Sequence, residues 1–397
     1  MRNTFTLFIA LCCMALCARA QEQVQERAQE RAQESGPQGE TTKTYKDKRP
    51  YKSWVRLAPK FEDSFFTTEE ALRIADNVLL YQHHTGGWPK NVYMPAELSR
   101  KERRKVRKQK DDANNSTIDN GATATEIRFL ARTYTAQSDG KLTAPQQLSA
   151  YKKAVEDGIR YILKSQYDNG GFPQFYPRPK GYYTHITYND NAMVNIMQLL
   201  REVYEGKAPY TFIPDSLQTR AKRAFDKGID CILKTQVKQN GKLTVWCAQH
   251  DEHTLAPAQA RAYELPSLSG AESDNIVLLL MSLPNPSSEI IAAVEGAIEW
   301  FKENKITGIH AEHFTNDEGK DDYRMAPCPQ DDYPCPPLWA RFYTLEDNRP
   351  FFCDRDGIKR FDLSEIGYER RNGYSWYNDE GNEVIRKYEK WKKKNNL

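Results

Sequence analysis

The sequence has little net charge, a single long hydrophobic run and none of several common catalytic motifs. The small net charge and the missing motifs each argue against a class of protein. Its 57 Lys and Arg residues nearly balance its 54 Asp and Glu residues, so the formal net charge is only +3 over 397 residues. Such a small excess argues against nucleic acid as the main partner. No GxSxG motif, GK[ST] phosphate loop or HExxH motif is present, so the usual signals of serine hydrolases, P-loop proteins and zinc proteases are missing.

The hydrophobic run lies at the N-terminus, over residues 4–17. A positive start precedes it and the small-x-small sequence ARA follows it at residues 18–20, which is typical of a secretory signal peptide. No other stretch approaches the roughly 18 apolar residues of a membrane helix, so we expect no stable membrane insertion. Residues 1–20 are predicted to be a signal peptide of a secreted protein, whether periplasmic, cell-surface or extracellular. A lipoprotein anchor at a cysteine of the run is a less favoured alternative.

Residues 21–50 are rich in Gln and Glu and have almost no large apolar side chains in their first part. Such a segment buries too little surface to offset the entropy lost on ordering, so it is predicted to be a low-complexity spacer. The folded domain is expected to occupy residues 51–397.

Five cysteines follow the predicted signal peptide, namely Cys231, Cys247, Cys328, Cys335 and Cys353. An odd number leaves at least one thiol free or paired between chains. Cys328 and Cys335 are close enough in sequence to close a small loop in an oxidising compartment.

Helical periodicity and an internal repeat predict the fold. Apolar residues recur at three- and four-residue steps over residues 69–82, 122–134, 148–166, 192–204, 216–236, 275–282 and 288–302. Three of these windows end in Gln82, Gln166 and Gln236, and each is followed by a Gly-containing turn, a polar loop and a new helix. Such repetition predicts stacked hairpins in an all-α-dominated (α/α)₃ toroid with long rim loops. Three unrelated helix–turn units are the alternative.

Acid–amide pairs begin two of the expected helices, Asp119-Asn120 and Asp190-Asn191. Helix capping is the ordinary role of these residue types. Their recurrence on what should be one rim also suits a hard cation such as calcium, which prefers carboxylate, amide and water oxygens. Asp119 and Asp190 are therefore candidate metal ligands, with capping as the alternative.

Cationic residues gather in other predicted loops. Lys90 closes the turn GGWPK, and Arg261, Arg341, Arg349 and Arg355 lie among aromatic residues. Because a guanidinium binds a carboxylate with two parallel hydrogen bonds, this group suits a repeating acidic ligand whose rings stack on aromatic side chains. Internal ion pairing with nearby acids is the alternative for each arginine.

Two further clusters have simpler interpretations. Residues 100–110 carry eight basic residues and one acid, and we favour a solvated helix face over a polyanion-binding patch. His250 and His253 are three residues apart, as are His310 and His313, but without a metal-binding frame we expect ordinary surface or core histidines.

Eight motifs, in order along residues 88–377, resemble the pectate lyases of polysaccharide lyase family 10. They are GGWPKN, TIDNGAT, GGFPQFYP, HITYNDNAM, WCAQHD, ARAYELPSLSGAES, ARFYTLEDNRPFFCDRDG and GYERRNGYSWY. The resemblance implies an (α/α)₃ toroid and a secreted enzyme that cleaves α-1,4-polygalacturonate by calcium-assisted β-elimination, giving 4,5-unsaturated oligogalacturonates. We expect a monomer that binds pectin or polygalacturonate and no nucleic acid.

The resemblance also implies residue roles. Arg261 would be the catalytic base that removes the C5 proton, with Asp190 and Asp119 at the calcium ion. The substrate-binding residues would be Lys90, Asp119, Asn120, Arg341, Arg349 and Arg355. Because a free guanidinium has a pKa above about 12, an arginine base predicts an alkaline activity optimum.

Two alternative functions are considered. A glycoside hydrolase would use two carboxylates such as Asp119 and Asp190, would need no calcium and would form no double bond. A non-catalytic acidic-glycan-binding protein would keep the groove without turnover, although the presence of Arg261 argues against it.

Overall fold

The computed structural model describes residues 50–138, 143–329 and 335–397. The predicted signal peptide and nearly all of the predicted spacer lie outside these residues. The described residues belong to one compact unit that spans residues 49–397.

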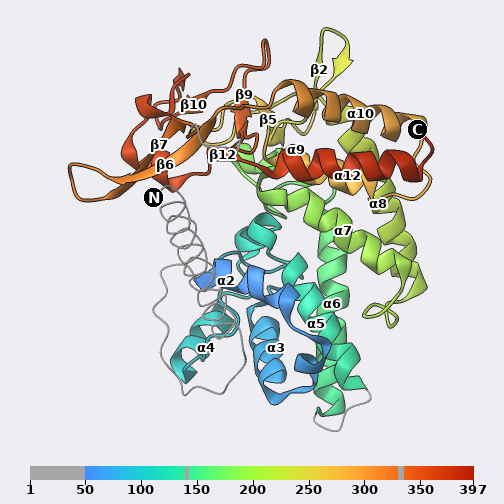
Figure 1. Cartoon of the computed structure of the whole chain (residues 1–397). Coiled ribbons are helices and arrows are strands. Elements are labelled where there is room, and N and C mark those ends of the chain that lie inside the picture. The colour runs from blue at the N-terminus through green and yellow to red at the C-terminus, as the bar shows by residue number, and fades with distance from the viewer. Residues whose placement is uncertain (1–49, 139–142, 330–334) are drawn as a thin grey trace, which may run out of the picture. The chain divides into compact units, whose positions relative to one another are not determined.

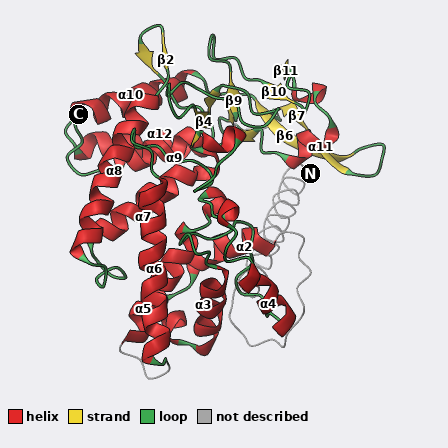
Figure 2. Cartoon of the chain, turned by 180° about the vertical axis from the view of Figure 1, so that it is seen from behind, coloured by secondary structure: helices red, strands yellow, loops and turns green. Residues whose placement is uncertain are grey.

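Helices dominate this unit (Figures 1 and 2). They are α2 (Pro50–Leu57), α3 (Glu69–Tyr81), α4 (Arg100–Lys108), α5 (Ala124–Ser138), α6 (Pro145–Ser165), α7 (Ala192–Glu205), α8 (Asp215–Thr235), α9 (Glu272–Met281), α10 (Ser288–Glu303), α11 (Tyr368–Gly373) and α12 (Glu380–Lys394). Every predicted helical window overlaps one of them. No helix among the described residues is long and apolar enough to cross a membrane.

The helices pack as hairpins in two adjoining layers. Helices α5, α7 and α9 pack in sequence in the inner layer, while α6, α8 and α10 pack in sequence in the outer layer. Each inner helix also packs on the outer helix that follows it in the chain, as Figure 1 shows for α5 with α6 and α7 with α8. The predicted (α/α)₃ toroid of helical hairpins is confirmed.

The sequence repeat has a physical basis in three glutamines at the ends of α3, α6 and α8. The side-chain amide of Gln82 donates to the carbonyl of Gly86 and to that of Ala154 in α6, both at 2.9 Å. Gln166 and Gln236 each make the same pair of bonds, one to the turn that follows and one to the next outer helix. Each glutamine therefore fixes a turn to the neighbouring hairpin, which explains why it recurs.

Glycine is required in two of these turns. Gly86 and Gly170 have positive φ angles of 97° and 93°. A Cβ atom added at these positions would lie 2.4 Å from the carbonyl oxygen of Asp157 and 2.0 Å from that of Lys227. The turns can therefore approach the next outer helix only without a side chain.

Short antiparallel contacts hold the rim loops in equivalent positions. In each repeat a backbone N–H donates to the carbonyl of an aromatic residue in or after the turn: Thr117 to Trp88, Thr187 to Phe172 and Ser269 to Trp246, at 3.1, 3.2 and 2.8 Å. The paired two-residue strands are β1 (Ile186–Thr187) with β4 (Gln249–His250), β5 (Leu268–Ser269) with β9 (Phe342–Tyr343), β8 (Trp339–Ala340) with β12 (Tyr377–Asn378), β10 (Phe352–Cys353) with β11 (Lys359–Arg360), and β2 (Lys238–Gln239) with β3 (Lys242–Leu243).

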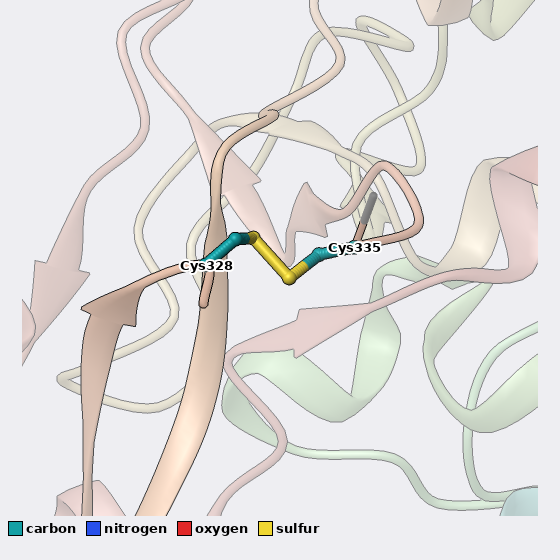
Figure 3. The surroundings of a disulfide bond; sticks show 2 residues. All are labelled: Cys328 and Cys335. Atoms are coloured by element: carbon teal, nitrogen blue, oxygen red, sulfur yellow. A yellow bond between two sulfur atoms is a disulfide. The ribbon is translucent and has the colours of Figure 1, made fainter. Parts of the chain in front are cut away.

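The segment 304–377 also contains a longer antiparallel hairpin of β6 (Ile309–Thr315) and β7 (Asp321–Pro327). Most of its side chains are exposed or half-buried on both faces. The sequence therefore lacks the apolar alternation that normally indicates a strand. Cys328 and Cys335 form a disulfide directly after this hairpin, as the sequence suggested (Figure 3). Cys231, Cys247 and Cys353 are buried and free.

A second hydrophobic cluster, separate from the main core, supports the C-terminal loops. It includes Tyr263, Phe342, Phe351, Phe352 and Trp376, all buried. Because the first four of these residues lie one to three positions from the predicted site arginines, their burial fixes the backbone that carries those charged side chains.

Candidate active site

A polar cleft of about 370 Å³ lies among the rim loops. Its lining residues are Lys90, Asp119, Asn120, Gln174, Tyr182, Asn189, Asp190, Gln249, Arg261, Glu264, Arg341, Gly373, Tyr374 and Ser375. Residues nearly 290 positions apart in the chain thus share one cavity, which holds both cationic and carboxylate side chains. A more apolar hollow beside β6 and β7 lacks this combination of charges.

The cleft brings together six of the eight site residues predicted from the sequence, namely Lys90, Asp119, Asn120, Asp190, Arg261 and Arg341. Arg349 and Arg355 do not line it. The guanidinium of Arg349 instead lies 3.6 Å from the ring centre of Phe361. Arg355 forms an exposed ion pair with Glu369 at 3.1 Å, and its substrate role stays a prediction.

The structural repeat shows which residues of the two acidic helix starts occupy equivalent positions. Asn120 and Asp190 both have left-handed backbones, with φ angles of 51° and 53°, each in the middle of a single 3₁₀ turn, η4 (Asp119–Gly121) or η6 (Asn189–Asn191). In the structural repeat, Asn120 is therefore equivalent to Asp190, and Asp119 is equivalent to Asn189. The two acids, Asp119 and Asp190, do not occupy equivalent positions. Capping does not account for either acid, because Asp119 lies five residues before α5 and α7 is preceded by Asn191.

Lys90 and Asp119 form an ion pair at one side of the cleft. Asp119 is 3% exposed, and its second carboxylate oxygen accepts a hydrogen bond from the backbone N–H of Asn120 at 3.0 Å. The Lys90 ammonium also lies 5.3 Å from the ring centre of Phe175, within the range of a cation–π contact. The lysine is thus held by a buried acid while its ammonium group stays accessible.

A chain of polar contacts connects Arg341 to Asp190. Arg341 forms a buried ion pair with Glu272 and donates to Asn189 Oδ1 at 3.1 Å. The amide of Asn189 in turn donates to Asp190 Oδ2 at 2.8 Å. Desolvation raises the pKa of Asp190, the charge of Arg341 opposes that change, and the charges of Asp119 and Glu272 add to it. A further positive charge at Asp190 would therefore be favourable.

Arg261 is held by a bidentate ion pair with Glu264. Its Nε and Nη2 atoms donate to the two carboxylate oxygens at 2.7 and 2.5 Å. The hydroxyl of Tyr374 donates to the same buried carboxylate at 2.8 Å. Desolvation lowers the pKa of Arg261, but the hydrogen bonds and charge of Glu264 outweigh it and raise the pKa above its ordinary value. Internal ion pairing, the alternative for each arginine, is thus present at Arg261.

The oxygen donors of the cleft fit a calcium ion only as a partial site. Two groups of three His, Cys, Asp or Glu side chains lie close enough to share an ion in the described ranges, and neither is in the cleft. Asp190 nevertheless offers a solvent-facing carboxylate beside the amide of Asn189, with a second acid, Asp119, as an electrostatic neighbour. Such a hard-oxygen set suits Ca²⁺ whose remaining ligands are waters and an acidic substrate.

His250 lies in the core and does not line the cleft. His250 is fully buried, and burial lowers its pKa to about 4. Its two ring nitrogens contact the backbone N–H of Cys247 and the carbonyl of Leu255. It is therefore the core histidine expected from the sequence.

Sequence reasoning missed four residues whose polar contacts hold the predicted side chains in place: Asn189, Glu264, Glu272 and Tyr374. All four lie inside motifs that were recognised, in YNDN, ARAYE, SGAES and NGYSWY. Two of them had a local signal, since Asn189 precedes the predicted ligand Asp190 and Glu272 begins α9.

Comparison with known proteins identifies the family of the chain. The family model described as pectic acid lyase matches residues 82–385. Two solved structures of a family 10 polysaccharide lyase from Cellvibrio cellulosa, one of them a point mutant in complex with trigalacturonic acid, are each 36% identical to the chain with a TM-score of 0.68. The alignments cover 85% of this chain and 96% of the mutant's, and 87% of this chain and 97% of the other's. No curated protein matches the chain by sequence.

The family match covers most of the chain and includes every residue that lines the cleft. The chain therefore belongs to the pectic acid lyase family, within polysaccharide lyase family 10, and is a polysaccharide lyase.

Proposed function

We propose that the protein is a secreted pectate lyase that cleaves α-1,4-polygalacturonate by calcium-assisted β-elimination. The observation that carries this proposal is the cleft itself, where Lys90, Arg261 and Arg341 stand around Asp119 and Asp190. Three cations suit the carboxylates of successive galacturonates, and the two acids suit a divalent ion between protein and substrate. The trigalacturonic acid in the complex of the similar polysaccharide lyase supports an acidic sugar chain as the substrate class.

In this reaction the C5 proton leaves, the electron pair forms a C4–C5 double bond, and the glycosidic C4–O bond breaks with its electrons on the departing oxygen. We assign proton removal to Arg261, and binding of the uronate carboxylates to Arg341 and Lys90. Asp190 and Asp119 would hold a calcium ion, which when bound stabilises the negative charge that develops on the substrate carboxylate. Asn189 positions Asp190 against Arg341 through its two hydrogen bonds.

Arg261 can act as a base only after it loses a proton, and its ion pair with Glu264 opposes that loss. Glu264 raises the pKa of Arg261, so the neutral guanidine that can accept a proton is a small fraction at every accessible pH. That fraction grows tenfold per pH unit below the pKa. We expect log(kcat/KM) to rise with a slope near +1 without a plateau up to about pH 10. Glu264→Gln should lower the pKa of Arg261 and shift the profile to lower pH. A flat profile from about pH 6 to 10 would exclude Arg261 as the base.

The proposal is tested by ultraviolet absorbance during incubation with polygalacturonate at alkaline pH. We expect the band of a 4,5-unsaturated uronate to grow with calcium and to stop growing when a chelator is added. Reducing ends without the band would identify a hydrolase. Binding without either signal would identify a non-catalytic acidic-glycan-binding protein. Growth that continues in chelator would refute the calcium requirement.

A further inference from the structure

Helix α4 carries a dense basic surface that the cleft does not use. Residues 100–110 have a formal charge of +7 in a chain whose net charge is only +3, so the remainder of the chain is net negative. Lys101, Arg104, Lys105 and Lys108 recur at three- and four-residue steps and are all exposed. These four residues are called the α4 patch below.

The α4 patch has no counter-charge of its own. In the part of the chain that the structure describes, none of its four side chains forms an ion pair, and the helix's single acid, Glu102, is engaged as the capping partner of Ser99. Like charges one turn apart destabilise a helix, and α4 has several such pairs. Helix α4 packs against α3 (Figure 1). Its opposite face makes this contact, since Val106 is buried and Arg103 donates to Asn77 of α3 at 3.0 Å.

The α4 patch and the cleft are connected by a short, well-anchored segment. Residues 109–118 lead from the end of α4 to Asp119 and reach at most about 40 Å when fully extended. The backbone of this segment bonds to the turn that leads to Lys90, through His84 to Lys110 at 2.9 Å and Thr117 to Trp88 at 3.1 Å. The segment that follows the patch is therefore anchored to the loops that supply Lys90 and Asp119.

We propose that the α4 patch binds a second segment of the same polygalacturonate chain, outside the catalytic cleft. The inference rests on the proposed function, because charge complementarity identifies the occupant: polygalacturonate carries one carboxylate per sugar and continues beyond any cleft that holds a few sugars. Binding at a second site raises the effective concentration of the polymer at the first. A short oligogalacturonate cannot reach both sites and gains nothing from the patch.

The test variant changes all four residues of the α4 patch to Gln (K101Q, R104Q, K105Q and K108Q). Gln has nearly the same helix propensity as Lys and Arg, so α4 should still form. The matched control changes Lys387, Lys390, Lys393 and Lys394 of α12 to Gln, which removes the same charge from another exposed helix face.

Cleavage is measured on trigalacturonate and on polygalacturonate at about 50 and 200 mM salt. We expect the patch variant to cleave trigalacturonate like the unmodified protein, while its KM for the polymer rises about tenfold at low salt. If polygalacturonate releases counterions like a single nucleic-acid strand, four contacts give a salt slope near −3, or roughly 50-fold in affinity over this range. The patch variant should lose most of that dependence, and the α12 variant should keep it.

An unchanged KM for the polymer would overturn the proposal and leave α4 to another partner, such as the glutamates of the chain's own residues 21–50. Equal losses on both substrates, or equal losses in the α12 variant, would also overturn it. Polymer binding is measured separately in both variants without turnover. If the unmodified protein cleaves neither substrate, the proposed function fails, and this binding measurement still decides whether the α4 patch holds polygalacturonate.

Discussion

Replacing Arg261 with alanine is expected to lower kcat/KM on polygalacturonate by about 10²- to 10⁴-fold, the usual contribution of a positioned general base. The physical reason is that no other described side chain in the cleft takes its place: Arg341 is only 11% exposed against 43% for Arg261, and Lys90 and Arg341 are both assigned to the substrate carboxylates. Calcium-dependent formation of the unsaturated product at fixed alkaline pH is the measurement.

The loss should be catalytic, because the Arg261 side chain is 43% exposed and its removal leaves Glu264 still bonded to Tyr374. Glu264 also keeps its bond from the backbone N–H of residue 261, so the stability loss should be smaller than in Arg341→Ala, and thermal unfolding measures it. Arg360→Ala is the matched control, since Arg360 forms a similar bidentate pair with Asp356 outside the cleft. If Arg261→Ala keeps more than a tenth of the activity, or if Arg360→Ala loses as much, Arg261 is not the base.

Replacing Arg341 with alanine is expected to damage stability and activity together. Its side chain is only 11% exposed and that of Glu272 only 4%, so the substitution strands a buried carboxylate. Breaking a buried pair from one side costs about 3–5 kcal/mol in the free energy of unfolding. Removing the guanidinium also takes a positive charge away from Asp190 and leaves its acidic neighbours Asp119 and Glu272, so at alkaline pH, where Asp190 is ionised, calcium should bind more tightly. Urea unfolding and the calcium concentration for half-maximal activity measure the two effects.

Two controls separate these effects. Arg371→Ala breaks a comparable pair with Asp322, whose side chains are 17% and 3% exposed, outside the cleft. It should cost similar stability without altering the calcium requirement. The double variant Arg341→Ala with Glu272→Ala should regain part of the stability, because no unpaired buried charge remains. An unchanged calcium requirement in Arg341→Ala would contradict the connection through Asn189.

The helical hairpins were predictable from the sequence, because local signals specify them. The glutamines at positions 82, 166 and 236 mark the ends of three outer helices, and each fixes a turn to the next hairpin. Gly86 and Gly170 mark turns that cannot accept a side chain. The β6–β7 hairpin was not predictable, because side chains on both of its faces are largely exposed and leave no alternating pattern.

The charged residues of the cleft were predictable as types, through motifs that resemble a known family. Their partners were not. Glu272 lies 69 positions from Arg341 and is its buried counter-ion, and Asn189 connects that arginine to Asp190 from 152 positions away. Nothing local in the sequence specifies such pairs, since they form only when separate rim loops are packed against each other.

The sequence by itself determined the hairpins, the family and most of the residue types in the cleft, because helix periodicity, turn chemistry and motifs are local properties of the chain. Only the tertiary structure decided which of the predicted arginines enters the cleft: Arg261 and Arg341 do, whereas Arg349 stacks on Phe361. It also decided the protonation balance of Arg261, because that depends on Glu264 being buried and aligned with both guanidinium nitrogens. Burial and charge proximity are properties of the packed molecule, and they set the pKa values on which the proposed chemistry depends.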